Sequence, residues 1–231
     1  MPPPTKTSIA TIAGYFDPLD PRAADISMEA IAHALARITR FNGHHHAPSG
    51  PDDPLRVRPH SMRVARIGWH LYDSMRPIVD APDWHRDKIE AVLALLLHDA
   101  PEGYTGDRLR PCKTDADRLA ETLILRAIVT RLGFVGPIGD RVIGWVDSDL
   151  CVAADNVALA QEALIFQPGA EDWTPGIPGV TPDLIASTLH LFWPRPRECW
   201  ISSVRVAGNA AATPDPTADG RALRGVLGID W

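Results

Sequence analysis

A histidine and three carboxylates directly follow a strongly apolar run of the chain. The run begins at Val92 and leads into the sequence His98-Asp99-Ala-Pro-Glu102-Gly-Tyr-Thr-Gly-Asp107. A buried helix that delivers an imidazole and a carboxylate side by side needs a compensating charge, because an unpaired carboxylate is costly to desolvate. A divalent cation provides that charge. The stretch therefore predicts a metal centre with His98 and Asp99 among its ligands.

Two predicted helices with apolar residues at helical spacing precede this stretch. The first is capped by Ser27 and is expected to end near Asn42-Gly43, so that Arg40 lies in its last turn, where a cation complements the helix dipole. The second begins at His60, directly after a proline. A lone histidine at a helix entrance is more often a surface or capping residue than a ligand. His60 becomes a candidate ligand through the other residues of the set.

Three consecutive histidines, His44–His46, lie in the loop between these two helices. A histidine cluster can bind metal, but three adjacent side chains on a loop cannot all face one ion without an unusual turn. His44, nearest the helix end, is the best placed of the three. The sequence leaves the role of the cluster open.

Two further carboxylates are expected near the histidine–aspartate pair. The third helix covers residues 86–98 and is expected to break near Pro101. Glu102 then lies on a turn, from which its carboxylate can point back towards the pair. Asp155 lies among small and apolar residues of a helical stretch over residues 138–165, an awkward place for an unpaired acid. It could be a buried helix-contact carboxylate, but a fourth metal ligand explains it better.

Cations gather in the loop over residues 105–113, which include Arg108 and Lys113. The ordinary interpretation of such a loop is a solvated connection between helices. Beside a metal centre, however, arginine supplies a planar fork and lysine a point charge for phosphate. The position of the loop favours a phosphate clamp.

The composition excludes several classes of protein. The 231-residue chain has a net charge of -6 and a pI near 5.8, which argues against a nucleic acid polymer as partner, since duplex-binding surfaces are basic. Its three cysteines form no C-x-x-C pair, so neither disulfides nor a cysteine zinc site is expected. The start lacks the apolar core of a signal peptide, and no run is long enough to span a bilayer. We expect a cytoplasmic protein that binds no membrane.

Helical periodicity with hardly a strand signal predicts an all-α fold. The chain divides into an irregular lead-in over residues 1–26, a helical domain over residues 27–166, and a Pro/Gly-rich extension over residues 167–231. The extension is expected to be irregular, apart from one short helix over residues 184–192, and to pack on the domain.

The order of these candidate residues carries a family resemblance. His60, then His98-Asp99, then Asp155 on successive helices resembles the ligand set of the HD-domain phosphohydrolase superfamily. The segment from His98 to Asp107, followed by Lys113, is similar to the H-D-x-x-E-x-x-x-G-D-(x)5-K signature of bacterial 5′-deoxynucleotidases. The segments Arg40-Phe41-Asn42-Gly43-His44 and His60-Ser61-x-x-Val64-Ala65 resemble phage dATP triphosphohydrolases.

The resemblance covers about residues 27–166 and departs from the family at named places. Phe41 stands where the deoxynucleotidases have tryptophan, the loop between His44 and His60 is longer than usual, and the chain after Phe166 is unmatched. The resemblance implies an HD-domain helical bundle with one divalent transition-metal ion (Co, Mn, Zn, Fe or Ni), with Mg as a further ion on the substrate phosphates. The implied ligands are His60, His98, Asp99 and Asp155.

The resemblance also implies roles for the neighbouring residues. The ion would act as a Lewis acid on the α-phosphorus and lower the pKa of water. Glu102 would orient or deprotonate the water, and Asp107 would assist proton transfer or hold the sugar. Substrate-binding residues would be Arg40 and Lys113, which neutralise phosphate charge, with Arg108 as a weaker candidate. Phe41 joins this set, although such an aromatic more often packs in a core.

Three functions follow as expectations. The first is a dNTP triphosphohydrolase that prefers dATP and releases deoxyadenosine and tripolyphosphate. The second is a 5′-deoxynucleotidase acting on deoxynucleoside monophosphates, and the third is a nucleotide sensor without turnover. In each case the partner is a deoxynucleotide. A homo-oligomer is expected by analogy with relatives that assemble.

Overall fold

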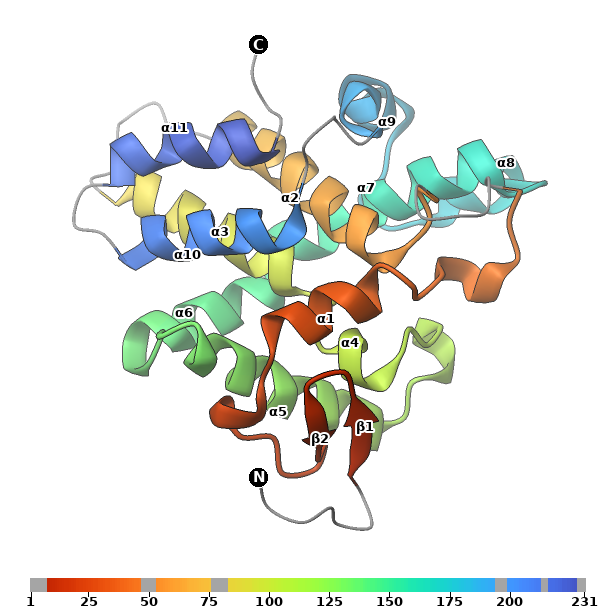
Figure 1. The fold of residues 1–231 in the computed structure, drawn as a ribbon. Coiled ribbons are helices and arrows are strands. Elements are labelled where there is room, and N and C mark those ends of the chain that lie inside the picture. Colours follow the sequence, from red (N-terminus) through yellow and green to blue (C-terminus); the bar gives the residue numbers. More distant parts are fainter. Residues whose placement is uncertain (1–7, 47–52, 76–82, 194–198, 213–215, 228–231) are drawn as a thin grey trace.

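The computed structural model describes residues 8–46, 53–75, 83–193, 199–212 and 216–227, which are predominantly helical (Figure 1). The all-α class predicted from the sequence is confirmed. Within the described ranges the only sheet is an antiparallel hairpin of β1 (Ile9–Thr11) and β2 (Gly14–Phe16). The α-helices are α1 (Met28–Leu35), α2 (Val57–Ser74), α3 (Trp84–Leu97), α4 (Glu102–Thr105), α5 (Asp115–Arg131), α6 (Gly136–Val146), α7 (Asp149–Phe166), α8 (Ala170–Trp173), α9 (Pro182–Thr188), α10 (Trp200–Ala212) and α11 (Pro216–Leu227).

Helix α3 forms the centre of the core. Every residue from Lys88 to Leu97 is buried, and α2, α6 and α10 pack against this helix (Figure 1). A helix that is apolar on nearly every side needs such surroundings. Helix α2 also packs along α7. The packing of α2 between α3 and α7 therefore brings three stretches, distant in sequence, to one place.

The segment after residue 166 differs from its prediction. Helices α10 and α11 occupy much of it, and Trp200, Val204 and Ala207 enter the same core as α3. The Trp200 indole N–H donates to the Leu96 carbonyl oxygen at 2.8 Å. The expected irregularity is wrong. The sequence did not predict α10 because alanines and a glycine in its second half dilute the apolar period. Residues 194–198, 213–215 and 228–231 of the segment lie outside the described residues.

The lead-in over residues 1–26 is also more regular than expected. Residues 1–7 are not among those described, but the hairpin that follows pairs Ile9 with Phe16. The Phe16 ring stacks on Tyr104 at 3.8 Å, and the Tyr104 hydroxyl accepts from the Ser27 N–H at 3.1 Å. Strands of three residues are too short to show an alternating pattern. The hairpin braces α4, the helical turn that carries Glu102.

Helix α1 begins as predicted and ends earlier. The Ser27 hydroxyl accepts from the Ala30 N–H at 3.1 Å and caps the helix, but the helix ends at Leu35. The predicted end near Asn42-Gly43 is wrong. Those residues belong to a separate 3-10 turn, Arg40–Gly43. Arg40 consequently lies outside α1, so the prediction that its charge complements the dipole of this helix is wrong.

The turn that carries Arg40 is fixed against the start of α2. The Arg40 N–H donates to the Leu55 carbonyl oxygen at 2.8 Å, and the Val57 N–H donates to the Ile38 carbonyl oxygen at 3.1 Å. Inside the turn Phe41 has a φ of 54°, a left-handed conformation that a bulky residue seldom adopts. Such strain persists only where the surroundings impose it.

The structure shifts the predicted start of α2 and divides the predicted helical stretch over residues 138–165. Helix α2 begins at Val57, so His60 lies within its first turn. The stretch predicted over residues 138–165 is two helices, α6 and α7, and the Ser148 hydroxyl accepts from the Cys151 N–H at 3.3 Å to cap the second. Helix α3 and the break after it agree with the prediction.

Two glycines of α6 give a matched pair for stability. A Cβ at Gly139 would lie 2.8 Å from the Phe134 carbonyl oxygen, whereas a Cβ at Gly144 would meet nothing within 4 Å. We expect Gly139→Ala to lower the free energy of unfolding by about 1–3 kcal/mol through overpacking. Gly144→Ala is expected to raise it by roughly 0.5–1 kcal/mol. Urea denaturation measures both; equal effects would contradict the close backbone approach.

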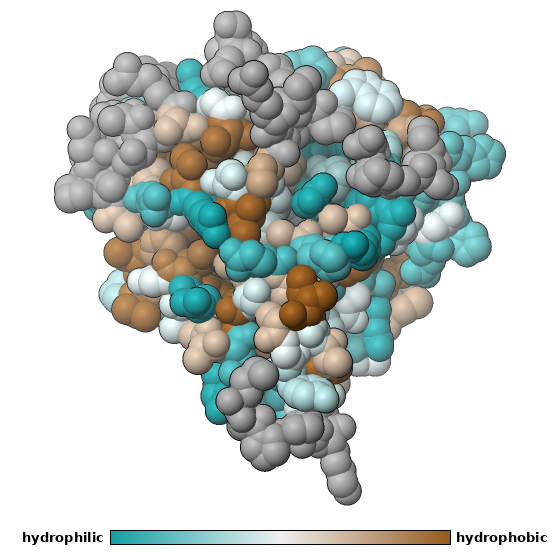
Figure 2. All heavy atoms as spheres, viewed as in Figure 1, coloured by the Kyte–Doolittle hydropathy of each residue, from teal (hydrophilic) through white to brown (hydrophobic). Residues whose placement is uncertain are grey.

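The face of the molecule drawn in Figure 2 carries both hydrophobic and hydrophilic side chains. Figure 2 shows hydrophobic residues gathered on the left of the face and a belt of hydrophilic residues across its middle. Within the described residues, no helix combines the length and the apolar composition that crossing a bilayer requires.

Candidate functional site

Two imidazoles meet where α2 and α3 come together. His60 lies in the first turn of α2, and His98 directly follows the last residue of α3. Their ring centroids are 5.5 Å apart. His60 is fully buried, so it is not the surface or capping residue that a lone histidine at a helix entrance usually is.

Both imidazoles face the carboxylate of Asp99. His98 Nε2 lies 3.1 Å from Asp99 Oδ2, and His60 Nε2 lies 3.6 Å from the same oxygen. All three atoms are buried, and among the described residues none has a hydrogen-bond partner of good geometry. Buried polar atoms without such partners are rare in folded proteins. The three atoms are close enough together to hold one metal ion.

The other ring nitrogen of each histidine is already engaged. His98 Nδ1 lies 2.7 Å from the Leu95 carbonyl oxygen, and His60 Nδ1 lies 2.7 Å from Oε1 of Glu162. Carbonyl and carboxylate oxygens only accept hydrogen bonds, so each Nδ1 carries a proton. In the neutral rings both Nε2 lone pairs then face Asp99, which is the tautomer that a metal ligand requires.

Asp155 reaches the same place from α7. Its Oδ1 lies 3.0 Å from His60 Nε2. It does not belong to the compact group of His60, His98 and Asp99. Of the four predicted ligands, the structure thus brings three into one group and the fourth to its edge. Two imidazoles and two carboxylates are a donor set that suits borderline divalent ions.

The two aspartates are held in their charged form. Burial raises the pKa of Asp99, but His98, His60 and Arg40 outweigh burial and hold it well below its usual value. Burial likewise raises the pKa of Asp155, and its contact with His60 outweighs this effect. Ionised carboxylates are the form that coordinates a cation.

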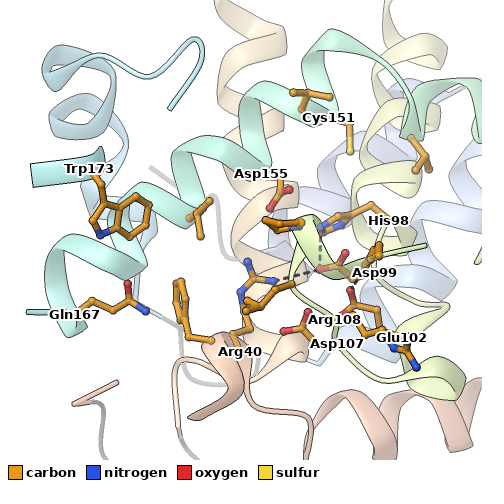
Figure 3. A pocket seen from close by; sticks show the side chains of 17 residues that line it. Arg40, His98, Asp99, Glu102, Asp107, Arg108, Cys151, Asp155, Gln167 and Trp173 are labelled. Carbon is orange, nitrogen blue, oxygen red and sulfur yellow. Dashed lines mark hydrogen bonds and ion pairs between the residues drawn. The ribbon is translucent and has the colours of Figure 1, made fainter. Parts of the chain in front are cut away.

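A cavity of about 520 Å³ opens beside the group. This volume lies within the roughly 300–1,000 Å³ typical of small-molecule sites. His98 and Asp99 lie at one end, Trp173 and Gln167 at the other, and Arg40 between them (Figure 3). The cavity therefore joins a charged end to an end with an aromatic ring and an amide.

Glu102 lies at the charged end with one oxygen engaged and one not. Lys113 Nζ lies 3.4 Å from Glu102 Oε1 and 2.9 Å from Glu121 Oε1. Glu102 Oε2 is buried and has no hydrogen-bond partner among the described residues. Burial, together with the charges of Asp99 and Asp107, holds the pKa of Glu102 well above its usual value. A carboxylate of raised pKa with an unengaged oxygen can accept a proton from water.

Arg40 contacts both Asp99 and Glu162, a residue that the sequence analysis did not single out. Its Nε lies 2.9 Å from Glu162 Oε2, and its Nη1 lies 3.5 Å from Asp99 Oδ2. Burial alone would lower the pKa of Arg40, but Glu162, Asp99 and Asp155 raise it above its usual value. Arg40 is therefore a permanent cation on the wall of the cavity.

The remaining predicted residues, Asp107, Phe41 and Arg108, all line the cavity, but they differ in what else they contact. Asp107 and Phe41 line it, and burial raises the pKa of Asp107. Phe41 also packs partly against a small core of Leu55, Phe166 and Phe192. Arg108 lines the cavity too, but its side chain is exposed and its Nη1 pairs with Asp117 Oδ2 at 3.1 Å.

Sequence reasoning missed three residues of this site. Glu162 is fully buried in α7, two helical turns after Asp155, and that spacing on an apolar helix was its only signal. Trp173 and Gln167 come from the segment expected to be irregular, and nothing in the sequence tied them to the cavity. The His44–His46 cluster, in contrast, does not contribute to the cavity lining.

Comparison with known proteins adds little on function. No protein-family model matches the chain. An uncharacterised protein of Rhodobacter capsulatus is 37% identical to it over 97 residues, which make up 42% of this chain and 41% of that protein. The chain thus matches less than half the length of this curated relative, whose description names no activity.

Proposed function

We propose that the protein is a metal-dependent phosphohydrolase of the HD-domain superfamily that acts on deoxynucleotides. One observation carries the proposal: Nε2 of His60, Nε2 of His98 and Oδ2 of Asp99 converge, buried and without good hydrogen-bond partners among the described residues, at the end of a cavity. The resemblance in sequence names the same residues as ligands. Of the three functions considered, a triphosphohydrolase preferring dATP is proposed first.

The donor set fits a divalent ion of the Mn, Co, Fe, Ni or Zn type. His60, His98 and Asp99 would hold it, with Asp155 completing the set. When bound, such an ion supplies Lewis acidity towards a phosphate oxygen and towards water. It would also offset the excess of carboxylates over permanent cations around the site.

The residues of the chain divide the remaining chemistry among them. Arg40 and Lys113 face the cavity as cations and bind the phosphates. Glu102 orients the water and takes its proton as the oxygen bonds to the α-phosphorus. The bond from phosphorus to the 5′ oxygen breaks, and that oxygen receives a proton, for which Asp107 is the assigned donor. The products are deoxyadenosine and tripolyphosphate, which balance dATP and one water.

A substrate panel tests this function. The full chain, loaded in turn with each of the five ions, is incubated with dATP, dAMP, the other deoxynucleotides and their ribonucleotide counterparts, and the products are separated by chromatography. Tripolyphosphate with deoxyadenosine supports the first function. Orthophosphate from dAMP alone would replace it with the 5′-deoxynucleotidase, and binding without turnover would replace it with the sensor. Light scattering of the same samples tests the homo-oligomer that was expected by analogy.

Trp173 offers the substrate base a stacking surface. Its side chain is 41% exposed at the cavity end opposite Asp99 (Figure 3). Since stacking a base on an aromatic ring contributes about 1–3 kcal/mol, Trp173→Ala is expected to raise KM for the nucleotide roughly tenfold with a smaller effect on kcat. Trp193→Ala, an exposed tryptophan outside the cavity lining, is the control. An unchanged KM in Trp173→Ala would remove the base from this end.

A further inference from the structure

Glu162 connects two parts of the proposed site through one carboxylate. It lies in α7 on the same helix as Asp155, and its side chain is fully buried. A buried glutamate in an apolar helix is costly unless every oxygen is paired. Both of its oxygens are paired, and two of the three partners belong to the site.

Oxygen Oε1 holds His60. His60 Nδ1 lies 2.7 Å from it, and Arg63 Nη1 contacts the same oxygen. Because the carboxylate only accepts, His60 must present its protonated Nδ1 to Glu162. His60 Nε2 is thereby turned towards Asp99 and Asp155.

Oxygen Oε2 holds Arg40. The Arg40 Nε donates to it at 2.9 Å, which leaves the two terminal nitrogens of the guanidinium for other partners. One of them, Nη1, lies 3.5 Å from Asp99 Oδ2, and the side chain lines the cavity beside Asp99 (Figure 3). The orientation of the arginine fork at the cavity is thus set by the same carboxylate that orients His60.

We propose that Glu162 is a positioning residue that fixes the metal ligand His60 and the anion-binding Arg40 relative to each other, so that metal binding and phosphate binding are coupled through it. The inference rests on the proposed function, since it takes His60 as a ligand and Arg40 as a phosphate contact. Outer partners of metal-binding histidines set the ring orientation and the tautomer, and their loss typically costs about 10–100-fold in metal affinity.

A purely structural role is the competing explanation. Arg63 is fully buried, its Nε donates to the Phe192 carbonyl oxygen at 3.1 Å, and its guanidinium lies 3.9 Å from the Phe192 ring centroid. Glu162 could serve only to neutralise this arginine. In that case its replacement would lower stability and leave the affinity for metal unchanged.

Glu90 supplies the matched control. It too is fully buried, and its two oxygens accept from Arg141 Nη2 at 2.7 Å and Nε at 2.8 Å. It does not line the cavity. Glu90→Gln therefore removes the charge of a buried glutamate that is paired with an arginine, and it does so without touching His60 or Arg40.

The experiment measures binding and not turnover. Equilibrium dialysis against Mn²⁺, followed by metal analysis, gives the metal affinity of the full-length wild type, Glu162→Gln and Glu90→Gln. Titration calorimetry with inorganic tripolyphosphate gives their anion affinity with and without Mn²⁺. We expect Glu162→Gln to weaken Mn²⁺ binding about 10–100-fold and to reduce the gain in tripolyphosphate affinity that Mn²⁺ produces. Glu90→Gln should change neither quantity.

The outcomes separate the inference from the proposed function. Unchanged Mn²⁺ affinity in a folded Glu162→Gln overturns the inference even if the wild type hydrolyses dATP. Weakened Mn²⁺ affinity supports it even if no deoxynucleotide is hydrolysed. Should Glu162→Gln not fold, NMR of the histidine ring nitrogens in the zinc-loaded wild type decides: a protonated Nδ1 on His60 supports the inference, and a protonated Nε2 overturns it.

Discussion

Glu102→Gln is expected to reduce kcat for deoxynucleotide hydrolysis by about 100- to 10,000-fold, the range that general acid–base catalysis typically contributes. Glutamine keeps the size of the side chain and can still receive the Lys113 contact through its amide oxygen. It cannot take a proton from water. Glu102 does not belong to the group of His60, His98 and Asp99 that could hold a metal ion. The metal content of the variant should therefore match that of the wild type.

The control for this substitution is Glu171→Gln, which neutralises an exposed glutamate of α8 outside the cavity lining. Its kcat should equal that of the wild type. Retention of full kcat in Glu102→Gln would remove Glu102 from the chemistry. Loss of metal together with activity would assign it to the ligand set instead.

Asp99→Asn is expected to abolish metal binding and, with it, activity. Asp99 Oδ2 lies near the Nε2 atoms of both imidazoles, at 3.1 Å from His98 Nε2 and 3.6 Å from His60 Nε2. A neutral amide is a poor ligand and removes the charge that the cation would meet. The loss of affinity should exceed the roughly 10–100-fold that loss of an outer partner costs. Equilibrium dialysis with metal analysis measures it.

Two controls accompany Asp99→Asn. Asp140→Asn neutralises an aspartate whose side chain is 73% exposed, and its metal content should not change. Urea denaturation of Asp99→Asn shows whether the variant is folded, because Asp99 also lies near Arg40 and its loss leaves the charge of this arginine less compensated. A folded Asp99→Asn that binds metal as tightly as the wild type would exclude Asp99 as a ligand.

The parts of the site that depend on local sequence were predictable. His98, Asp99 and Glu102 are neighbours in the chain, so the end of one buried helix and the turn after Pro101 already place them together. The proximity of His60 and Asp155 depends on how α2 and α7 pack. Their order along the chain, read through a family resemblance, led to the expectation that they approach the pair.

Features that depend on packing alone were not predictable. The only sequence signal of Glu162 is its spacing of two helical turns from Asp155 on an apolar helix. Its role depends on His60 and Arg40, which come from other segments. Helix α10 was not predicted because half of its buried positions are alanine, a residue common in any helix. Arg40 was assigned to the end of α1, although backbone hydrogen bonds to residues 55–57 determine where it lies.

The most direct measurement of the central claim is the metal stoichiometry of the full chain. The protein is stripped with a chelator, dialysed against each of Mn²⁺, Co²⁺, Fe²⁺, Ni²⁺ and Zn²⁺, and analysed for bound metal beside Asp99→Asn. The convergence of His60, His98 and Asp99 predicts one ion per chain for the wild type and none for the variant. Substoichiometric binding of all five ions by the wild type, or equal occupancy in the two proteins, would contradict a metal centre at this site.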